Sequence, residues 1–167
     1  ALQYDALFQD SASQQENASV MALLGDVTAS RVLDIGCGTG LLLDHCTPGA
    51  YCGLDPSRAM LDRLCAKHPA YAPHVLACPF EDFVGQDFDV ITCLFGSANY
   101  IPPAALAQIP LFLRPGGRYL LMFFQPDYTP VTHTKTGVTI PYMPGITVTL
   151  PGTVKTVGHF LVLTGTV

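Results

Sequence analysis

Three glycines that follow a short apolar segment have the spacing of a ligand-binding loop. Gly36, Gly38 and Gly40 come directly after residues 31–35, whose apolar side chains predict a buried strand. Glycine lets the backbone approach a ligand closely, because no side chain stands between the ligand and the N–H groups. A helix starting behind the loop would add a partial positive charge. The pattern predicts a strand, a glycine loop and a ligand held by backbone groups.

An acidic residue follows the next apolar segment. Asp55 comes 19 residues after Gly36 (55 − 36), directly after residues 50–54. In a doubly wound sheet, the carboxyl ends of neighbouring parallel strands lie at the edge where ligands bind. A carboxylate at that edge can accept hydrogen bonds from both hydroxyls of a ribose. A dinucleotide site and an adenosylmethionine site both fit these residues.

The glycine spacing separates these two kinds of site. Dinucleotide-binding loops prefer GxGxxG, whereas residues 36–40 read GxGxG, and Asp34 stands inside the preceding strand. The segment Val32–Gly40 closely resembles the first motif of class I S-adenosylmethionine-dependent methyltransferases. In that family the acid matching Asp34 orients the glycine loop and helps to hold the amino-acid end of the cofactor.

Three further segments resemble the same family in the same order, and with the first they cover about residues 31–124. Residues 53–61 resemble the second motif, whose acid binds the ribose; residues 88–92 resemble the fourth strand; and residues 113–118 resemble the turn before the fifth. The resemblance implies S-adenosyl-L-methionine as the cofactor. The cofactor-binding residues that we expect are Tyr4, Asp34, Gly36, Cys37, Gly38, Gly40, Asp55, Pro56, Met60, Phe80, Glu81 and Leu94.

The sequence departs from the family pattern in two places. After the third strand, Cys78 or Pro79 stands where the family usually has an acid that contacts the adenine. We expect Phe80 to cover the adenine ring, with Glu81 or Asp82 nearby. The helix that usually follows the fifth strand is also missing, because residues 126–137 contain two prolines and a glycine. One face of the sheet is then either bare or covered by a partner chain.

The loop after the fourth strand contains the candidate catalytic residues. Ser97, Asn99 and Tyr100 would lie over the methyl-donor position, where they could orient a substrate or could serve only to cap and pack the loop. This loop lacks the Asp/Asn-Pro-Pro-Tyr sequence of enzymes that methylate amino groups of nucleic acids. His133 and His159 lie in the tail, where a substrate could reach them.

The elements that would position these residues alternate between strand and helix. This alternation predicts an α/β fold with a doubly wound, mostly parallel, Rossmann-like sheet. The expected strands span residues 31–35, 50–54, 74–77, 88–95 and 119–124, and the expected helices lie at 1–24 (interrupted by its polar middle, 9–19), 40–46, about 56–67 and 102–113. The tail predicts an antiparallel edge, with strands at 138–140, 146–150 and 159–164 and few helices after the fifth strand.

Length and composition limit the alternatives. The chain has 167 residues, enough for one domain, with 49% hydrophobic residues, 13% charged residues and a net charge of −5. We divide this domain into a helical cap (1–30), a cofactor-binding core (31–124) and a β-rich segment (125–167). The low charged fraction leaves apolar surface for a wide substrate mouth or for an interface, so a homo-oligomer is a candidate assembly.

Several classes of partner are disfavoured. No run of Lys or Arg suggests a nucleic-acid groove, and no apolar stretch approaches the length of a membrane span. The six cysteines form no CxxC pair and no metal-ligand spacing, which is typical of reduced thiols. Because the first residues do not resemble a signal peptide, we expect a cytoplasmic protein with no metal site.

These observations predict a methyltransferase that acts on a small molecule. Two alternatives remain: a non-catalytic adenosylmethionine-binding protein or partner subunit, and a nicotinamide-dependent oxidoreductase. The sequence does not identify the acceptor or the atom that is methylated.

Overall fold

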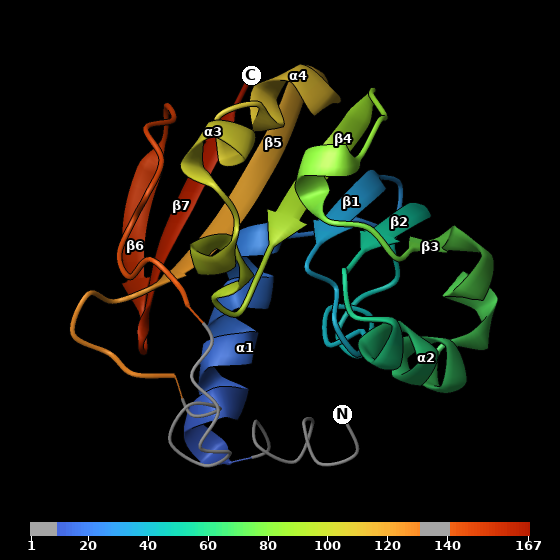
Figure 1. Ribbon diagram of the computed structural model, residues 1–167, viewed down its shortest axis with the longest axis horizontal. Helices are drawn as coiled ribbons and strands as arrows, with labels where there is room; N and C mark the ends of the chain where they lie inside the picture. The colour runs from blue at the N-terminus through green and yellow to red at the C-terminus, as the bar shows by residue number, and fades with distance from the viewer. Residues whose placement is uncertain (1–9, 131–140) are drawn as a thin grey trace.

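A computed structural model describes residues 10–130 and 141–167, which form a seven-stranded sheet (Figure 1). The strand order is β3-β2-β1-β4-β5-β7-β6. The first five strands pair in parallel, whereas β7 runs antiparallel to both of its neighbours. The strands are β1 (Arg31–Ile35), β2 (Ala50–Leu54), β3 (Val75–Leu76), β4 (Phe88–Cys93), β5 (Leu113–Phe124), β6 (Thr153–Val157) and β7 (Phe160–Thr166).

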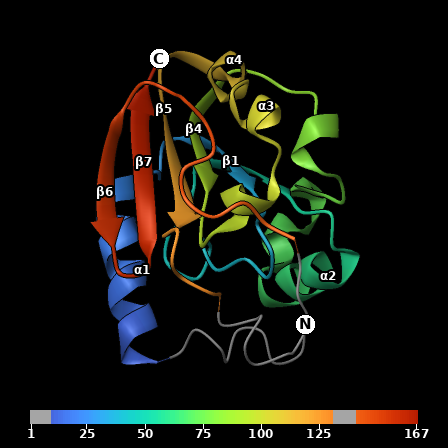
Figure 2. The same ribbon diagram turned by 60° about the vertical axis from the view of Figure 1, so that its left-hand side comes forward.

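Short helices cover both faces of this sheet. They are α1 (Ser11–Leu24), α2 (Arg58–Lys67), α3 (Pro103–Leu106) and α4 (Ile109–Phe112), with 3₁₀ turns η2 (Pro69–His74), η3 (Phe80–Asp82) and η4 (Ser97–Tyr100). In Figure 1, α3 and α4 lie in front of the sheet, and in Figure 2, α1 lies behind β6 and β7. The mostly parallel, Rossmann-like class with an antiparallel edge is therefore confirmed.

Alternating side chains of β5 supply both halves of the core. Leu120 and Met122 pack with Val20 of α1, whereas Leu121 and Phe123 pack on the face that α3 and α4 cover. Successive side chains of a strand point to opposite faces, so a continuously apolar strand suits a sheet that is covered on both sides. The N-terminal helix is thereby fixed beside the ends of β4 and β5.

The N-terminal helix differs from the expectation. Residues 11–24 form one continuous helix, so the prediction that the polar stretch 9–19 interrupts it was wrong for its described part. The Asp10 side chain caps the helix by accepting a hydrogen bond from the backbone N–H of Ser13 at 2.9 Å. Val20 and Leu24 anchor its other end in the core. A cap and two core contacts outweigh the polar composition of the exposed turns.

One predicted helix is absent, and another is split into two shorter helices. Residues 40–45 form turns and not a helix, because Gly40 has a φ of +85°, outside the helical region. The helix predicted at 102–113 is split into α3 and α4. Pro110 has no N–H to continue the hydrogen bonding of α3, and it stands instead in the first turn of α4.

The last strands are partly as predicted. The strand expected at 159–164 is β7, but residues 146–150 are irregular, and β6 was not expected at all. The strand expected at 138–140 lies outside the described residues. No helix occurs in the described parts of the connection from β5 to β6, residues 125–130 and 141–152. β4 also ends at Cys93 and not at Phe95, because Phe95 has a φ of +53°.

Candidate functional site

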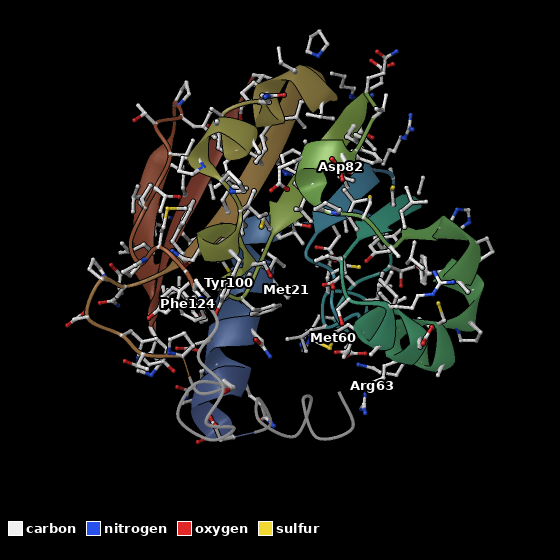
Figure 3. All side chains as sticks on the ribbon, viewed as in Figure 1. Met21, Met60, Arg63, Asp82, Tyr100 and Phe124 are labelled. Carbon is white, nitrogen blue, oxygen red and sulfur yellow. The ribbon has the colours of Figure 1, made fainter. Side chains whose placement is uncertain are left out.

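A cavity of about 470 Å³ opens at the carboxyl ends of β1 and β2. Six of the predicted cofactor-binding residues line it, together with Ser97 and Tyr100 of η4; the six are Gly36, Asp55, Pro56, Met60, Phe80 and Glu81. Met60 extends from α2 and Tyr100 from η4, on either side of the cavity (Figure 3). Segments far apart in the sequence thus form one site at the edge where an α/β sheet binds ligands.

Asp55 connects the second strand to the glycine loop. Its carboxylate accepts hydrogen bonds from the backbone N–H of Gly38 at 3.0 Å and from that of Ser57 at 2.8 Å. Burial raises the pKa of Asp55, while these two N–H groups act to lower it. The carboxylate is therefore held at the tip of β2, where it lines the cavity in a position suited to a diol.

The glycine loop is held tightly at Gly36. The N–H groups of Gly36 and Cys37 both donate to the carbonyl of Leu54, at 2.8 and 2.9 Å. A Cβ added to Gly36 would lie 2.6 Å from the Cβ of Ser97, and the φ of +70° is itself unfavourable for a side chain. Only glycine therefore lets the loop pass between β2 and η4.

Asp34 lies beneath the loop and not in the cavity. It is 3% exposed, and its two carboxylate oxygens accept hydrogen bonds from the hydroxyls of Tyr51 at 3.0 Å and Thr92 at 2.8 Å. Burial raises the pKa of Asp34 to about 7, against the opposing effect of the two hydroxyls. The structure brings Asp34 next to β2 and β4, and its contact with a cofactor stays a prediction.

Other predicted residues lie around the loop without lining the cavity. Cys37 is buried, and burial raises the pKa of its thiol far above the usual range, so it is a poor nucleophile. A Cβ on Gly38 would make ordinary contacts with Met60 at 3.6 Å and the Gly36 carbonyl at 3.9 Å, whereas one on Gly40 would press on Leu64 and His68. Leu94 is buried in the core. Tyr4 and His133 lie outside the described residues.

Phe80 and Glu81 form the wall opposite the loop. Phe80 is 5% exposed and packs against Phe112, with ring centroids 5.2 Å apart. Together with Cys78 and Pro79 they give the cavity an apolar end with one acidic group. An aromatic base fits such a wall, and the adenine contact of Phe80 stays a prediction.

A second cavity of about 190 Å³ shares Ser97 and Tyr100 with the first. Its other walls are α1, the loop after β4, the end of β5 and the start of β7. Figure 3 shows Tyr100 and Phe124 side by side beside α1. Tyr128 lines this cavity as well, and its ring packs on Phe124 at 5.7 Å. Phe95 lines it with a φ of +53°, a strained conformation of the kind found near functional sites.

Asn99 has a different place from Ser97 and Tyr100. It is fully buried; its amide NH₂ donates to the carbonyls of Met143 and Gly145, and its oxygen accepts from the backbone N–H of Phe124 at 2.7 Å. Both amide hydrogens of Asn99 are therefore donated to backbone carbonyls within the fold. Asn99 therefore caps and positions the loop, which is the second of the two roles that the sequence left open for it.

Two further polar residues of the second cavity were missed in the sequence. Glu16 and Asn17 lie on α1, in the stretch that we had interpreted as an interruption, and both line the cavity. The signal was present in the spacing: Ser13, Glu16, Asn17 and Val20 stand at positions i, i+3, i+4 and i+7, which share one face of a helix. His159, a candidate from the sequence, also lines this cavity.

A family model described as a methyltransferase domain matches residues 10–143. The match covers most of the chain and every residue that lines the two cavities except His159 and Phe160. The chain belongs to the S-adenosylmethionine-dependent methyltransferases of class I. S-adenosylmethionine is accordingly its cofactor, and the residues of the first cavity are compatible with it: a carboxylate in Asp55, a glycine at position 36 where an added Cβ would meet Ser97, and an apolar wall. The contact of Asp55 with the ribose stays a prediction.

Named relatives of this methyltransferase domain act on small molecules. It is 34% identical over 97 residues, 53% of this chain and 40% of the relative, to a dTDP-3-amino-3,4,6-trideoxy-alpha-D-glucopyranose N,N-dimethyltransferase of Streptomyces venezuelae. The structure of CalS10, an amino pentose methyltransferase from Micromonospora echinaspora, is 29% identical, with a TM-score of 0.54 over 76% of this chain and 57% of that one.

A third similar structure covers nearly the whole domain. It is the Burkholderia thailandensis 1,6-didemethyltoxoflavin-N1-methyltransferase, with a TM-score of 0.65 over 98% of this chain and 81% of that one; at 21% identity it shows the fold alone. The domain spans only 40% of the length of its curated relative.

The part of the chain that the structure describes contains no group of three or more side chains arranged to hold a metal ion. Within the same residues, no helix has the length and apolar character required to cross a membrane.

Proposed function

We propose that this domain transfers the methyl group of S-adenosylmethionine to a small-molecule acceptor. The observation that carries the proposal is that the two cavities share Ser97 and Tyr100. One cavity has the residues expected for the cofactor, and the other adjoins it with room for a second molecule. The relatives named for small-molecule methylation support the same kind of acceptor.

The residues of the domain would work mainly by placement. When bound, S-adenosylmethionine supplies an activated methyl group, so a correctly placed lone pair is the main requirement. Asp55 and the glycine loop would hold the cofactor, and Glu81 and Phe80 would face its base. Tyr100 would separate the two ligands from water, since its side chain lines both cavities. Alignment and exclusion of water then provide the rate enhancement.

The test measures binding and transfer separately. Calorimetry with S-adenosylhomocysteine measures occupation of the first cavity, and methyl-tritiated S-adenosylmethionine with pooled metabolites measures transfer. We expect binding of one ligand per chain together with acceptor-dependent labelling. Tyr128 lines only the second cavity, so Tyr128→Ala should lower transfer about tenfold or more and leave the cofactor affinity within about twofold.

Leu111→Ala is the control, because Leu111 is 76% exposed and lines neither cavity. Stoichiometric binding with no transfer to any pool would favour the alternative function, a non-catalytic adenosylmethionine-binding protein. Loss of cofactor binding in Tyr128→Ala would show that the two cavities are assigned wrongly.

A further inference from the structure

We propose that the second cavity binds a protonated amine, which Glu16 and Asn17 of α1 recognise. This inference rests on the proposed function, since it names the chemical class of the acceptor. An amine bound as its ammonium ion would first release one proton, for which the second carboxylate oxygen of Glu16 is the available acceptor. Its nitrogen lone pair would then be free to take the methyl group. Its grounds are an amide and a fixed carboxylate on adjacent residues of α1, and an aromatic wall from the end of β5 and the segment that follows it.

The amide of Asn17 lacks a partner within the fold. Asn17 is 6% exposed and lines the cavity, and its side chain makes no hydrogen bond among the residues that the structure describes. A ligand in the cavity that carries a polar hydrogen can donate it to the amide oxygen. The position of Asn17 therefore indicates a polar group of the ligand close to α1.

The carboxylate of Glu16 is held in place by the turn between β6 and β7. Its Oε1 accepts a hydrogen bond from the backbone N–H of His159 at 2.9 Å. A Cβ on Gly158 would lie 1.7 Å from the same oxygen, so this glycine makes the room in which the carboxylate sits. The backbone contact uses one oxygen and leaves the other for a ligand. Glu16 is therefore a preorganised negative charge at the cavity.

The surroundings of this carboxylate favour a cation. Asp10 lines the same cavity, and no Lys or Arg occurs among the described residues that line it. Its aromatic wall includes Phe124 and Tyr128, and the Tyr128 ring stacks on His159 with centroids 4.1 Å apart. Aromatic faces attract cations because the ring carries negative charge density on its faces. An ammonium group can interact with the carboxylates, the aromatic faces and the amide oxygen. An alcohol can hydrogen-bond to the amide only, and a carboxylate would be repelled by the acidic side chains.

The experiment uses three probes of the same shape that differ in charge. Cyclohexylamine, cyclohexanol and cyclohexanecarboxylate are titrated at pH 7.5 into the protein saturated with S-adenosylhomocysteine, and ¹H–¹⁵N NMR follows the side-chain amide of Asn17 and the backbone of His159. We expect saturable shifts of both signals, with the ammonium binding at least about tenfold tighter than the alcohol.

Variants identify the groups responsible. Glu16→Gln retains the oxygen that accepts from His159 but removes the charge, so it should weaken the ammonium about fivefold or more and leave the alcohol unchanged. Asn17→Leu, of similar volume, should weaken both. Asp62→Asn is the matched control, because the Asp62 side chain is 73% exposed on α2, in an ion pair with Arg58; it should change neither.

Opposite results would overturn the proposal. Equal or tighter binding of the alcohol or the carboxylate, or an unchanged ammonium affinity in Glu16→Gln, would show that the cavity does not select an amine. Affinity for S-adenosylhomocysteine is measured for each variant by calorimetry. The ammonium titration is also carried out without S-adenosylhomocysteine. A protein that binds the ammonium there but does not bind S-adenosylhomocysteine would refute the proposed function and leave the amine site intact, so the two failures are distinguishable.

Discussion

We propose that the Asp55 carboxylate both fixes the backbone around it and binds the cofactor, and one substitution can separate these two functions. It accepts from the backbone of Ser57 within its own turn and from Gly38 across the loop. Asp55→Asn retains one acceptor oxygen, which can preserve the turn, but it removes the charge and one acceptor. We expect affinity for S-adenosylhomocysteine to fall about 10- to 100-fold in calorimetry, because charge-assisted hydrogen bonds contribute roughly 1.5–3 kcal/mol.

The control for this prediction is Ser57→Ala, which retains the backbone N–H that Asp55 binds. Its affinity should stay within about threefold of the wild type. A loss below about threefold in Asp55→Asn would mean that this acid does not bind the ribose.

Asp34 should make stability depend on pH. Its pKa is raised from 3.8 to about 7 by burial, so between these values the folded chain binds a proton that the unfolded chain has released. Stability from this group is therefore greatest at low pH, and it is lost as the pH rises toward about 7. Relative to Asp34→Asn, which cannot ionise, the wild type should lose free energy of unfolding between pH 5 and pH 8. Urea unfolding of both proteins at several pH values measures this difference, and parallel curves would contradict the assignment.

At the scale of elements, the loop after β4 is fixed by one side chain. Asn99 joins η4 to the end of β5 and to the segment 143–145 through three hydrogen bonds. Asn99→Leu would leave these backbone groups buried without a partner. We expect the free energy of unfolding to fall by about 3 kcal/mol in urea denaturation. Ser97→Ala, in the same turn, removes only a 3.4 Å contact to Gly36 and should cost less than about 1 kcal/mol.

The N-terminal helix shows why elements were harder to predict than motifs. Its exposed turns are polar, and only Val20, Leu24 and the capping Asp10 reveal its extent. The split of the predicted helix at Pro110 and the unexpected strand β6 were missed for the same reason. The boundaries of these elements depend on which backbone groups form hydrogen bonds with neighbouring elements. Local amino-acid composition does not contain that information.

For the whole molecule, ligand selectivity gives the broadest test. A ligand that binds only the folded chain stabilises it by about 2.7 kcal/mol at 100 times its Kd. S-adenosylhomocysteine at that concentration should raise the Tm by about 5–10 °C in a thermal unfolding scan. NAD and NADP at the same concentration should not. A larger shift with NAD would show that the first cavity holds a dinucleotide, contrary to the GxGxG spacing.

The sequence by itself determined the cofactor half of this protein. The glycine spacing and Asp55 belong to local strand–loop units, and a local backbone conformation needs few distant contacts to be recognised. The tertiary structure decided the other half. Asn99 was indistinguishable from a substrate-binding residue until its partners at 124, 143 and 145 were in place. Glu16 and Asn17 became candidates only when α1 packed beside β5 and β7, because a pocket exists only where elements distant in sequence meet.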